Sequence, residues 1–413
     1  MATGCTEPGA VALAVAKACS LLDGIPDSIE LLLSKNVYKN AMGVGIPGTG
    51  MSGLPIAVAV AATAGRPERG LEVLSVSAEE IQAAKQWLSC NMERIHIGIK
   101  DCSERLYIEC RCEQASNSSK VVIAHKHTGF VFISKNDEVL LDDCSQQQGD
   151  ASQNTSSCEA SVSPALSVAV VYEYATTTPI DELRFILDTT RLNEAAATEG
   201  LKGYGLNAGR ILMECAGEDI VHRVVASTVA ASDARMDGCT LPIYSNSGSG
   251  NQGITCTVPV CEYARLTNCS EERLTRALIL SHLMSIYVKQ GIGRLSALCG
   301  IVNASLGVAS AITYLKGGTH TQITYAIKNL INTITGMICD GAKPSCALKI
   351  SAGLYSAFIA SDLACNNFVV DATDGISESC VECSIKNLVR LGHDGMCQTD
   401  DMILDIMTHK QTQ

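Results

Sequence analysis

The chain has 413 residues, a formal net charge of −12 and a sequence pI of about 5.2. This acidic balance argues against a nucleic-acid or membrane-surface partner, because both require a basic face. No apolar run reaches the roughly 18–20 residues that a membrane span needs, and the first ten residues lack the basic region of a secretory signal. We therefore expect a soluble, cytoplasmic protein.

Composition favours a globular protein of two domains with closely packed helices. The length exceeds that of one ordinary small core, and hydrophobic residues make up 46% of the chain. Only 4% of the residues are aromatic, so small residues must fill much of the core. The 20 cysteines do not indicate a disulfide scaffold, because such scaffolds are short and secreted. We expect most of these thiols to be reduced and buried.

The first part of the chain combines one helix with a series of strands. Residues 5–22 form a predicted helix in which Thr6 is the N-cap, Pro8 lies in the first turn and Glu7 faces the positive helix end. Between 28 and about 139, short segments rich in β-branched residues predict an antiparallel or mixed sheet, with a helix in SAEEIQAAKQWLS. The polar segment 143–161 reads as a surface loop or linker.

After residue 163 the pattern is helical almost to the end of the chain. The clearest helices are DELRFILDTTRLNEAAATEG, EERLTRALILSHLMSIYVKQG, LCGIVNASLGVASAITYL, THTQITYAIKNLINTITGMI and CALKISAGLYSAFIASDLA. The fold class is therefore α+β. We expect a mostly helical domain made of residues 1–27 and 160–413, with a smaller α/β domain inserted at 28–150.

Cys5 lies in Gly4-Cys5-Thr6-Glu7-Pro8, at the start of the first predicted helix. The positive end of the helix dipole and the free amides lower the pKa of a thiol placed there. Such a thiol can act as a base or a nucleophile. The alternative is a buried structural cysteine.

A second group of candidates is Cys299, Cys339 and Cys346. Asp340 and Gly341 should turn the chain, and Pro344 should open the next helix, so that Cys346 lies in a first turn with free amides. Three thiolates on a four-iron cluster would leave one iron open as a Lewis acid. A zinc site usually shows close C-x-x-C pairs, and these three cysteines form none. The alternative is three buried thiols.

The segment Ser245–Gly253 reads SNSGSGNQG and follows ASDARMDG. It combines hydroxyls, side-chain amides and free backbone amides at a turn, which suits a carboxylate, an amine or an oxyanion. The alternative is a linker, but a linker would rarely contain so many amide side chains. We favour a binding site with these candidates: Asn246, Ser247, Gly248, Ser249, Asn251 and Gln252.

Other segments carry weaker signals. Tyr38-Lys39-Asn40 precedes GVGIPGTGMSGLP, which lacks the order of a phosphate loop and is either a backbone nest or a turn-rich connection. Cys380 and Cys383 form a C-x-x-C pair that could be redox-active, bind metal or be incidental. Cys110 and Cys112 are expected on opposite faces of a strand. His125 and His127 are expected to be strand histidines, although His127 could reach a site.

Together these segments resemble one protein family. GCTEP, KNAMGVGIPGT, ASDARMDG with SNSGSGNQG, and the spacing of Cys299, Cys339 and Cys346 are similar to those of the L-cysteine desulfidases. These stand beside the alpha chain of iron–sulfur L-serine dehydratases and the proteins of UPF0597 type. The resemblance runs from Gly4 to about Asp374, and the SNSGSGNQG run is its most specific part.

The resemblance implies an enzyme that converts L-cysteine into hydrogen sulfide, ammonia and pyruvate. Cys299, Cys339 and Cys346 would ligate a [4Fe–4S] cluster, and pyridoxal phosphate would not be needed. Cys5 would be the base that takes the α-proton, with Glu7 beside it. The substrate would be bound by the amide-rich run and by Lys39 and Asn40.

Two rivals remain at this point. Serine dehydratase would use the same fold with hydroxide as the leaving group, and a non-catalytic iron–sulfur sensor or sulfur carrier would need no base. The serine dehydratases can close the fourth iron with a cysteine at the extreme C-terminus. The last cysteine here is Cys397, which favours the desulfidase. We expect a small-molecule partner, L-cysteine, with no nucleic acid or membrane, and consider a homodimer because helices rich in small residues often associate.

Overall fold

The computed structural model describes residues 4–136, 138–143, 166–293 and 296–410. These residues form two compact units. The helical unit comprises Met1–Cys5 and Ser167–Gln413, and the α/β unit comprises Thr6–Leu166. The predicted linker at 143–161 and the predicted domain boundaries at 150 and 160 lie almost wholly outside the described residues. The predicted class, α+β with a mixed sheet, is confirmed.

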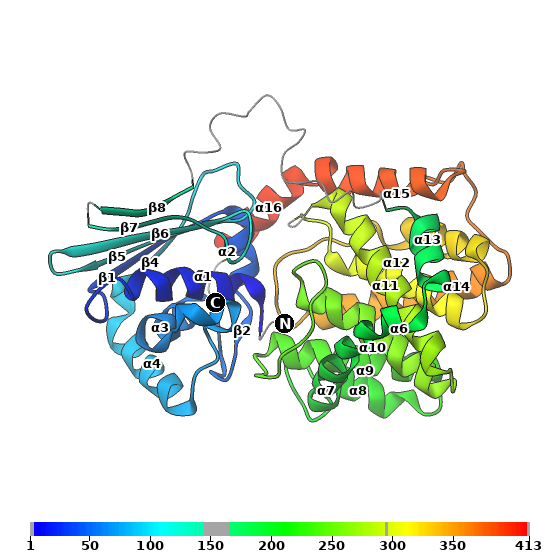
Figure 1. The fold of residues 1–413 in the computed structure, drawn as a ribbon, viewed down its shortest axis with the longest axis horizontal. Coiled ribbons are helices and arrows are strands. Elements are labelled where there is room, and N and C mark those ends of the chain that lie inside the picture. Colours follow the sequence, from blue (N-terminus) through cyan, green and yellow to red (C-terminus); the bar gives the residue numbers. More distant parts are fainter. Residues whose placement is uncertain (1–3, 137, 144–165, 294–295, 411–413) are drawn as a thin grey trace. The chain divides into compact units, whose positions relative to one another are not determined.

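The α/β unit is built on a six-stranded sheet with the order β4-β1-β5-β6-β7-β8 (Figure 1). Only β1 and β4 are parallel, and every other neighbouring pair is antiparallel. Alternate residues of β1 are fully buried, which fixes its register because a slip of one residue would expose them. The strands are β1 (Ser28–Leu33), β4 (Ile95–Ile99), β5 (Tyr107–Gln114), β6 (Asn117–Ala124), β7 (Phe130–Lys135) and β8 (Glu138–Asp142).

In the part of this unit that the structure describes, the α-helices are α1 (Thr6–Cys19), α2 (Lys35–Ala41), α3 (Leu54–Ala64) and α4 (Ala78–Asn91). Helix α1 packs on β5 and β6, and α3 packs between α1 and α4. Helix α4 begins with a capping box in which Ser77 and Glu80 bond each other's backbone amides. The short hairpin of β2 (Gly45–Ile46) and β3 (Met51–Ser52) precedes α3.

The position of α1 differs from the sequence prediction, which assigned residues 1–27 to the helical domain. In the structure α1 belongs to the α/β unit. Its small apolar side chains are buried nearly all round, from Ala10 to Ala18, and the Ser119 hydroxyl of β6 donates to the Ala18 carbonyl. A helix with no polar face must be covered on every side, and here the sheet and α3 cover it.

The helical unit contains most of the remaining chain. Helix α12 is central and packs against α10, α11, α13 and α14. The α-helices of the helical unit are α5 (Val168–Thr177), α6 (Ile180–Leu183), α7 (Asp188–Gly200), α8 (Ala208–Ala216), α9 (Ile220–Met236), α10 (Gly250–Leu266), α11 (Glu271–Ile292), α12 (Gly300–Leu315), α13 (His320–Ile334), α14 (Cys346–Cys365), α15 (Val381–Arg390) and α16 (Cys397–Thr408). A π-helical turn, η5 (Leu391–Gly395), joins the last two.

Small residues let these helices approach closely, as the composition predicts. A Cβ placed on Gly307 of α12 would lie 2.2 Å from the Ser281 carbonyl oxygen of α11. A Cβ on Gly353 of α14 would lie 2.4 Å from the Ser305 hydroxyl of α12. Both distances are shorter than a carbon–oxygen contact allows, so glycine sets the separation of these helices. Among the described residues, no helix is long and apolar enough to span a membrane.

Three local expectations were wrong. The predicted helix over 181–200 is interrupted by a 3₁₀ segment, η4 (Arg184–Leu187). Cys110 and Cys112 lie on one face of β5 with their sulfurs 3.7 Å apart, because residues two apart on a strand point the same way. His125 and His127 follow the end of β6 in a turn, where His125 has a left-handed φ of 63°.

Candidate active site

Cys299 and Cys339 lie on two chain segments that pair in antiparallel fashion within the helical unit. Leu298 and Ile338 form the bridge between them. The Cys299 amide donates to the Met337 carbonyl at 3.0 Å, and the Cys339 amide donates to the Ala297 carbonyl at 2.6 Å. Cys299 is the N-cap of α12. Two cysteines separated by 40 residues are thus brought onto neighbouring strands of backbone.

Cys346 is the first residue of α14, as predicted, and follows a turn in which Gly341 has a φ of 91°. Asp340 holds this turn, because its carboxylate pairs with both Lys343 and Lys349. The Lys349 ammonium also donates to the Ile338 carbonyl at 2.9 Å. The two lysines outweigh the effect of burial and hold the pKa of Asp340 at about 2. The turn therefore ties the Cys339 segment to the start of α14.

The three thiols influence one another electrostatically. Burial, together with the charges of Cys339 and Cys346, raises the pKa of Cys299 to about 12. Burial also raises the pKa of Cys346, with the charge of Cys339 acting in the same direction. The three sulfurs are therefore within electrostatic reach of one another. The raised pKa values keep Cys299 and Cys346 protonated unless a bound cation replaces their protons.

Three thiols are a donor set that a four-iron cluster can use. Within the described residues, no group of three or more His, Cys, Asp or Glu side chains is arranged to hold one metal ion. A four-iron cluster makes a different demand, because each cysteine binds its own iron and the sulfurs need not meet at one point. Lys349 adds a positive charge, which suits thiolates and cluster sulfurs.

The SNSGSGNQG run forms a tight turn followed by a helix start. Asn246 and Ser249 exchange backbone hydrogen bonds, and the two residues between them, Ser247 and Gly248, have φ values of 49° and 80°. These values define the two-residue turn that small residues favour. Ser249 is the N-cap of α10, and its hydroxyl accepts a hydrogen bond from the backbone N–H of Gln252. The run is therefore an ordered loop and not a linker.

Buried amide and imidazole groups fix the side chains of this turn. The side-chain amide nitrogen of Gln252, Nε2, donates to Asn246 Oδ1 and to the Ser285 hydroxyl, each at 3.0 Å. Asn246 in turn donates to His282 Nδ1 at 3.1 Å, and His282 Nε2 lies 3.0 Å from the Thr257 hydroxyl. Burial lowers the pKa of His282 to about 4, so the ring is neutral, accepts at Nδ1 and donates at Nε2.

The turn and the cysteines meet at Gln252. Its side chain is fully buried, and its carbonyl oxygen Oε1 has no hydrogen-bond partner among the described residues. A Cβ placed on Gly300, the residue after Cys299, would lie 3.1 Å from that oxygen. A buried acceptor without a donor is costly, and such groups often mark a place where a ligand supplies the donor. The structure therefore brings two of the predicted segments together.

Asn251 is held by a second buried group. The Arg235 guanidinium donates to Asn251 Oδ1 at 3.1 Å, and Arg235 belongs to the ASDARMDG segment on α9. A Cβ on Gly250 would lie 2.2 Å from the Arg235 Nε, so glycine is required there. The two motifs that follow each other in sequence thus form one buried arrangement.

The remaining predicted residues belong to the start of α1 and to α2. In the α/β unit Asn40 donates to Glu7 Oε1 at 3.3 Å, and His127 Nε2 lies 3.8 Å from the same oxygen. Lys39 is buried and Asn40 Oδ1 is an unsatisfied acceptor among the described residues. Cys5 is buried and is grouped with the helical unit. The structure thus gathers Glu7, Asn40 and His127, of which His127 was expected to be a strand residue.

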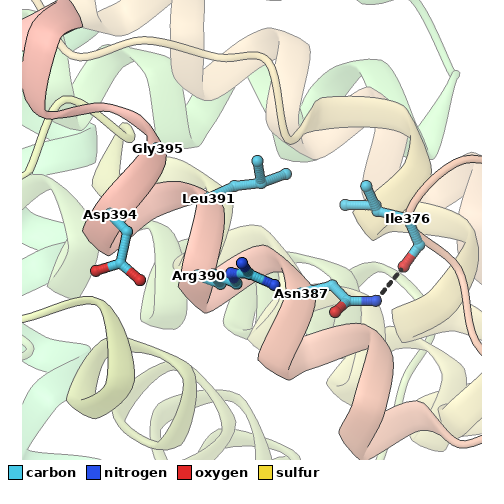
Figure 2. A pocket seen from close by; sticks show the side chains of 6 residues that line it. All are labelled: Ile376, Asn387, Arg390, Leu391, Asp394 and Gly395. Atoms are coloured by element: carbon cyan, nitrogen blue, oxygen red, sulfur yellow. Dashed lines mark hydrogen bonds between the residues drawn. The ribbon is translucent and has the colours of Figure 1, made fainter.

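A separate pocket of about 450 Å³ lies in the helical unit at the junction of α15 and η5 (Figure 2). None of the predicted site residues lines it. Its walls are formed by Ile376, Asn387, Arg390, Leu391, Asp394 and Gly395.

Sequence reasoning missed the residues that support the turn. His282, Ser285 and Asn193 lie inside helical patterns, where an isolated polar residue usually reads as incidental. Asn193 donates to the Tyr244 and Gly253 carbonyls and to Thr257. A polar residue at an apolar helix position was the signal available for each of them. Only the fold shows that all three form hydrogen bonds with the turn and the helix that follows it.

Comparison with known proteins assigns the class. The fold is α+β, and its helical unit holds Cys299, Cys339 and Cys346 beside an amide-rich turn. Residues 68–405 match the family model described as serine dehydratase alpha chain, and the chain belongs to this family, whose name denotes a lyase.

Similar proteins carry the name UPF0597 protein. The one from Phocaeicola vulgatus is 50% identical over 419 residues, covering 99% of this chain and 95% of the relative. The one from Bacteroides thetaiotaomicron is 48% identical over 417 residues, with the same coverage. The one from Aeromonas hydrophila is 42% identical over 416 residues, covering 99% of this chain and 94% of the relative.

Proposed function

We propose that the protein is an iron–sulfur L-cysteine desulfidase, which converts L-cysteine into hydrogen sulfide, ammonia and pyruvate by α,β-elimination. The observation that carries the proposal is the position of the unsatisfied Gln252 oxygen against Gly300, directly after Cys299. It joins an amide-rich binding turn to the cysteine group. The family assignment to serine dehydratase alpha chains supports a lyase of this type.

In this proposal Cys299, Cys339 and Cys346 hold a [4Fe–4S] cluster. When bound, the cluster would supply an iron with an open coordination position, a Lewis acid for the sulfur that leaves the β-carbon. The fit rests on three thiols within electrostatic reach of one another and on the nearby Lys349 ammonium. Gly300 and Gly341, close after Cys299 and Cys339, carry no side chains that would take up space beside a cluster. Pyridoxal phosphate has no part in the proposal.

The turn at 246–252 would bind the amino-acid end of the substrate. Gln252 Oε1 is an acceptor in need of a donor, and the substrate ammonium group provides one. The neutral His282 fixes Asn246, and Asn246 fixes the Gln252 amide, so the carbonyl oxygen cannot turn away. Ser247 and Gly248 expose backbone at the tip of the turn, where a carboxylate could bind.

Cys5 would remove the α-proton of the substrate. It immediately precedes α1, where the helix dipole favours a thiolate. Glu7, in the first turn of the helix, would orient this segment through its bonds with Thr6 and Asn40. Removal of the α-proton by a positioned base and withdrawal of charge from the leaving sulfur are the two requirements of the elimination.

Two alternatives are distinguishable from this proposal. The family name favours L-serine dehydratase, in which hydroxide would leave in place of sulfide. A non-catalytic iron–sulfur sensor or sulfur carrier would use the same three cysteines without a base. The test is an anaerobic reconstitution with iron and sulfide, followed by assays of sulfide and pyruvate released from L-cysteine and from L-serine.

We expect sulfide and pyruvate in equal amounts from L-cysteine, and a loss of at least 100-fold in turnover for Cys5→Ser with the cluster absorbance retained. Cys299→Ser should lose the absorbance. The matched control is Cys365→Ser, which changes the opposite end of α14 from Cys346 and should leave both readouts unchanged. Pyruvate from L-serine alone would favour the dehydratase, and full turnover in Cys5→Ser would remove Cys5 from the mechanism.

A further inference from the structure

Cys380 and Cys383 form a thiol pair at the start of α15, away from the residues assigned above. Cys380 is the N-cap of the helix, with extended backbone angles of φ −92° and ψ 131°, and Cys383 is the third helical residue. Both side chains are exposed. The C-x-x-C spacing at a helix start is the arrangement used by thiol–disulfide exchange sites, because the helix places both sulfurs on one side.

The two thiols are electrostatically different. The backbone amides of Cys383 and Glu382 lower the pKa of Cys380, although the Cys380 side chain makes no regular cap hydrogen bond. The neighbouring Cys380 sulfur raises the pKa of Cys383. One thiol is therefore prepared to attack a disulfide, and its neighbour keeps a proton until the second step.

The helix start is anchored on both sides, so the pair has a fixed setting. The Glu382 carboxylate accepts from the Val168 amide at 2.8 Å and from the Tyr287 hydroxyl. The Ser384 hydroxyl accepts from the Glu378 amide at 3.0 Å. These bonds join α15 to α5 and α11 and hold the segment that precedes the pair.

Figure 2 shows the pocket that Asn387 and Arg390 of α15 help to line. Asn387 and Arg390 follow Cys383 by four and seven residues, which places them on one stripe of an α-helix. Asn387 donates to the Ile376 carbonyl at 3.1 Å and closes one wall. Arg390 adds a guanidinium group, and Asp394, paired with His393, adds a carboxylate. Opposite charges beside apolar Leu391 and Ile376 suit the ammonium and carboxylate groups of an amino acid.

We propose that Cys380, Cys383 and the adjacent pocket form a thiol–disulfide exchange site for a low-molecular-mass disulfide with amino-acid ends. Arg390 binds a carboxylate of the ligand, and Asp394 binds its ammonium group. The proposal does not depend on the lyase activity, because it uses none of the residues assigned to that site.

The exchange proceeds in two steps. The Cys380 thiolate attacks one sulfur of the disulfide, so the ligand's S–S bond breaks, one ligand thiolate leaves and a mixed disulfide forms. The Cys383 thiol then loses its proton and attacks the Cys380 sulfur, which expels the second ligand thiolate. The protein dithiol is oxidised to a disulfide, the ligand is reduced to two thiols, and the two protons of the dithiol end on those thiols.

The test uses the full reduced chain and graded ratios of oxidised to reduced glutathione, with alkylation and peptide mass analysis. Trypsin cleaves after Lys349 and Lys386, so one peptide carries Cys365, Cys380 and Cys383. We expect this peptide to lose two hydrogens through a Cys380–Cys383 bond while Cys365 remains alkylated. Cys383→Ser should accumulate a mixed disulfide on Cys380, and Cys380→Ser should react on the order of tenfold more slowly.

Exposed Cys90 and Cys397 measure the background reaction of lone thiols. If Cys380 and Cys383 stay alkylated at ratios that already modify these two residues, the exchange site does not exist.

Arg390→Gln tests the pocket: exchange should slow several-fold with glutathione disulfide and cystine but not with uncharged hydroxyethyl disulfide. An equal effect, or none, on all three disulfides would refute the pocket's role. Because the three variants alter exposed side chains, thermal unfolding should match that of the parent protein.

Discussion

His282 and Asp233 are buried titratable side chains, and burial shifts the pKa of each toward the range in which its neutral form is favoured. His282 shares hydrogen bonds with Asn246 and Thr257. Asp233, on α9, is fully buried, and its Oδ2 accepts from the Gly209 amide at 2.8 Å. The environment of His282 predicts the cost of replacing it, and that of Asp233 predicts how stability depends on pH.

Replacement of His282 by Phe should cost about 2–4 kcal/mol in the free energy of unfolding, because Asn246 and Thr257 would each lose a buried partner. Chemical denaturation measures this cost. His96→Phe on β4 changes an exposed histidine and should stay within about 0.5 kcal/mol. A cost for His282→Phe no larger than that of the control would show that the imidazole bonds do not hold the turn.

Asp233 predicts a pH dependence of stability. Burial raises its pKa to about 6 and outweighs the backbone amides that lower it. The folded state therefore binds its proton more tightly than the unfolded state, whose carboxyl titrates near 4. This contribution to stability is complete below about pH 4 and is lost as the pH rises toward 6, on the order of 2–3 kcal/mol.

Denaturation midpoints between pH 4 and 7 should show this loss, and Asp233→Asn should remove it. The amide keeps the acceptor for the Gly209 amide and carries no charge at any pH. An unchanged pH profile in Asp233→Asn would mean that other carboxyl groups account for the slope.

At the scale of elements, close helix approach and one ion-paired turn determine the geometry of the site. Helix α12 begins at Gly300, directly after its N-cap Cys299, and contacts α11 at Gly307. The turn from Cys339 to Cys346 depends on Asp340. Both features can be changed without touching a predicted ligand.

Gly307→Ala should destabilise the protein by about 2–4 kcal/mol, because its Cβ would lie 2.2 Å from the Ser281 backbone carbonyl oxygen and the backbone cannot retreat easily. Thermal unfolding measures the effect. Gly336→Ala is the matched control, since a Cβ there meets nothing within 4 Å. Equal stability of the two variants would contradict the tight α11–α12 contact.

Asp340→Ala should reduce the iron retained after anaerobic reconstitution several-fold, because Lys343 and Lys349 would no longer hold the turn between two proposed ligands. Iron and sulfide analysis after gel filtration gives the result. Asp362→Ala removes an ion pair with Lys316 near the far end of α14 and should not change iron content. Equal retention in both variants would argue against a role of the turn in cluster binding.

At the scale of the whole molecule, the chain divides into two compact units with cores of their own. The α/β unit is continuous in sequence from Thr6 to Leu166. Its core is formed by the buried face of β1, which carries Ile29, Leu31 and Leu33, and by α1. A continuous segment with its own core meets the physical requirement for independent folding.

A fragment of residues 6–166 should therefore unfold cooperatively, with circular dichroism showing both helix and strand. Leu31→Ala should lower its stability by about 2–4 kcal/mol, since Leu31 is fully buried. Val139→Ala is the control, because Val139 is exposed. A fragment without a cooperative transition would show that the unit needs the rest of the chain.

Local patterns determined much of this structure. Alternation in SIELLLSK predicts β1, the small-residue composition predicts close helix contacts, and Cys346 at a helix start follows from Pro344 and the preceding turn. These features depend on residues near one another in the chain, so hydrophobic period and backbone preference were sufficient. The strand positions of β5 and β6 were predicted, but the shared face of Cys110 and Cys112 follows from strand geometry and was misjudged.

Only the tertiary structure decided which distant segments meet. The sequence marks Gln252 and Cys299 as separate candidates, but it contains nothing that measures the distance between the starts of α10 and α12. The packing of α10 on α12 brings the Gln252 oxygen to Gly300, and α11 supplies His282 and Ser285 to hold it. The tertiary structure also shows that α1 packs on the sheet of the α/β unit, whereas the sequence predicted it in the helical domain. Long-range contacts depend on how apolar faces are covered throughout the chain, and no local pattern contains that information.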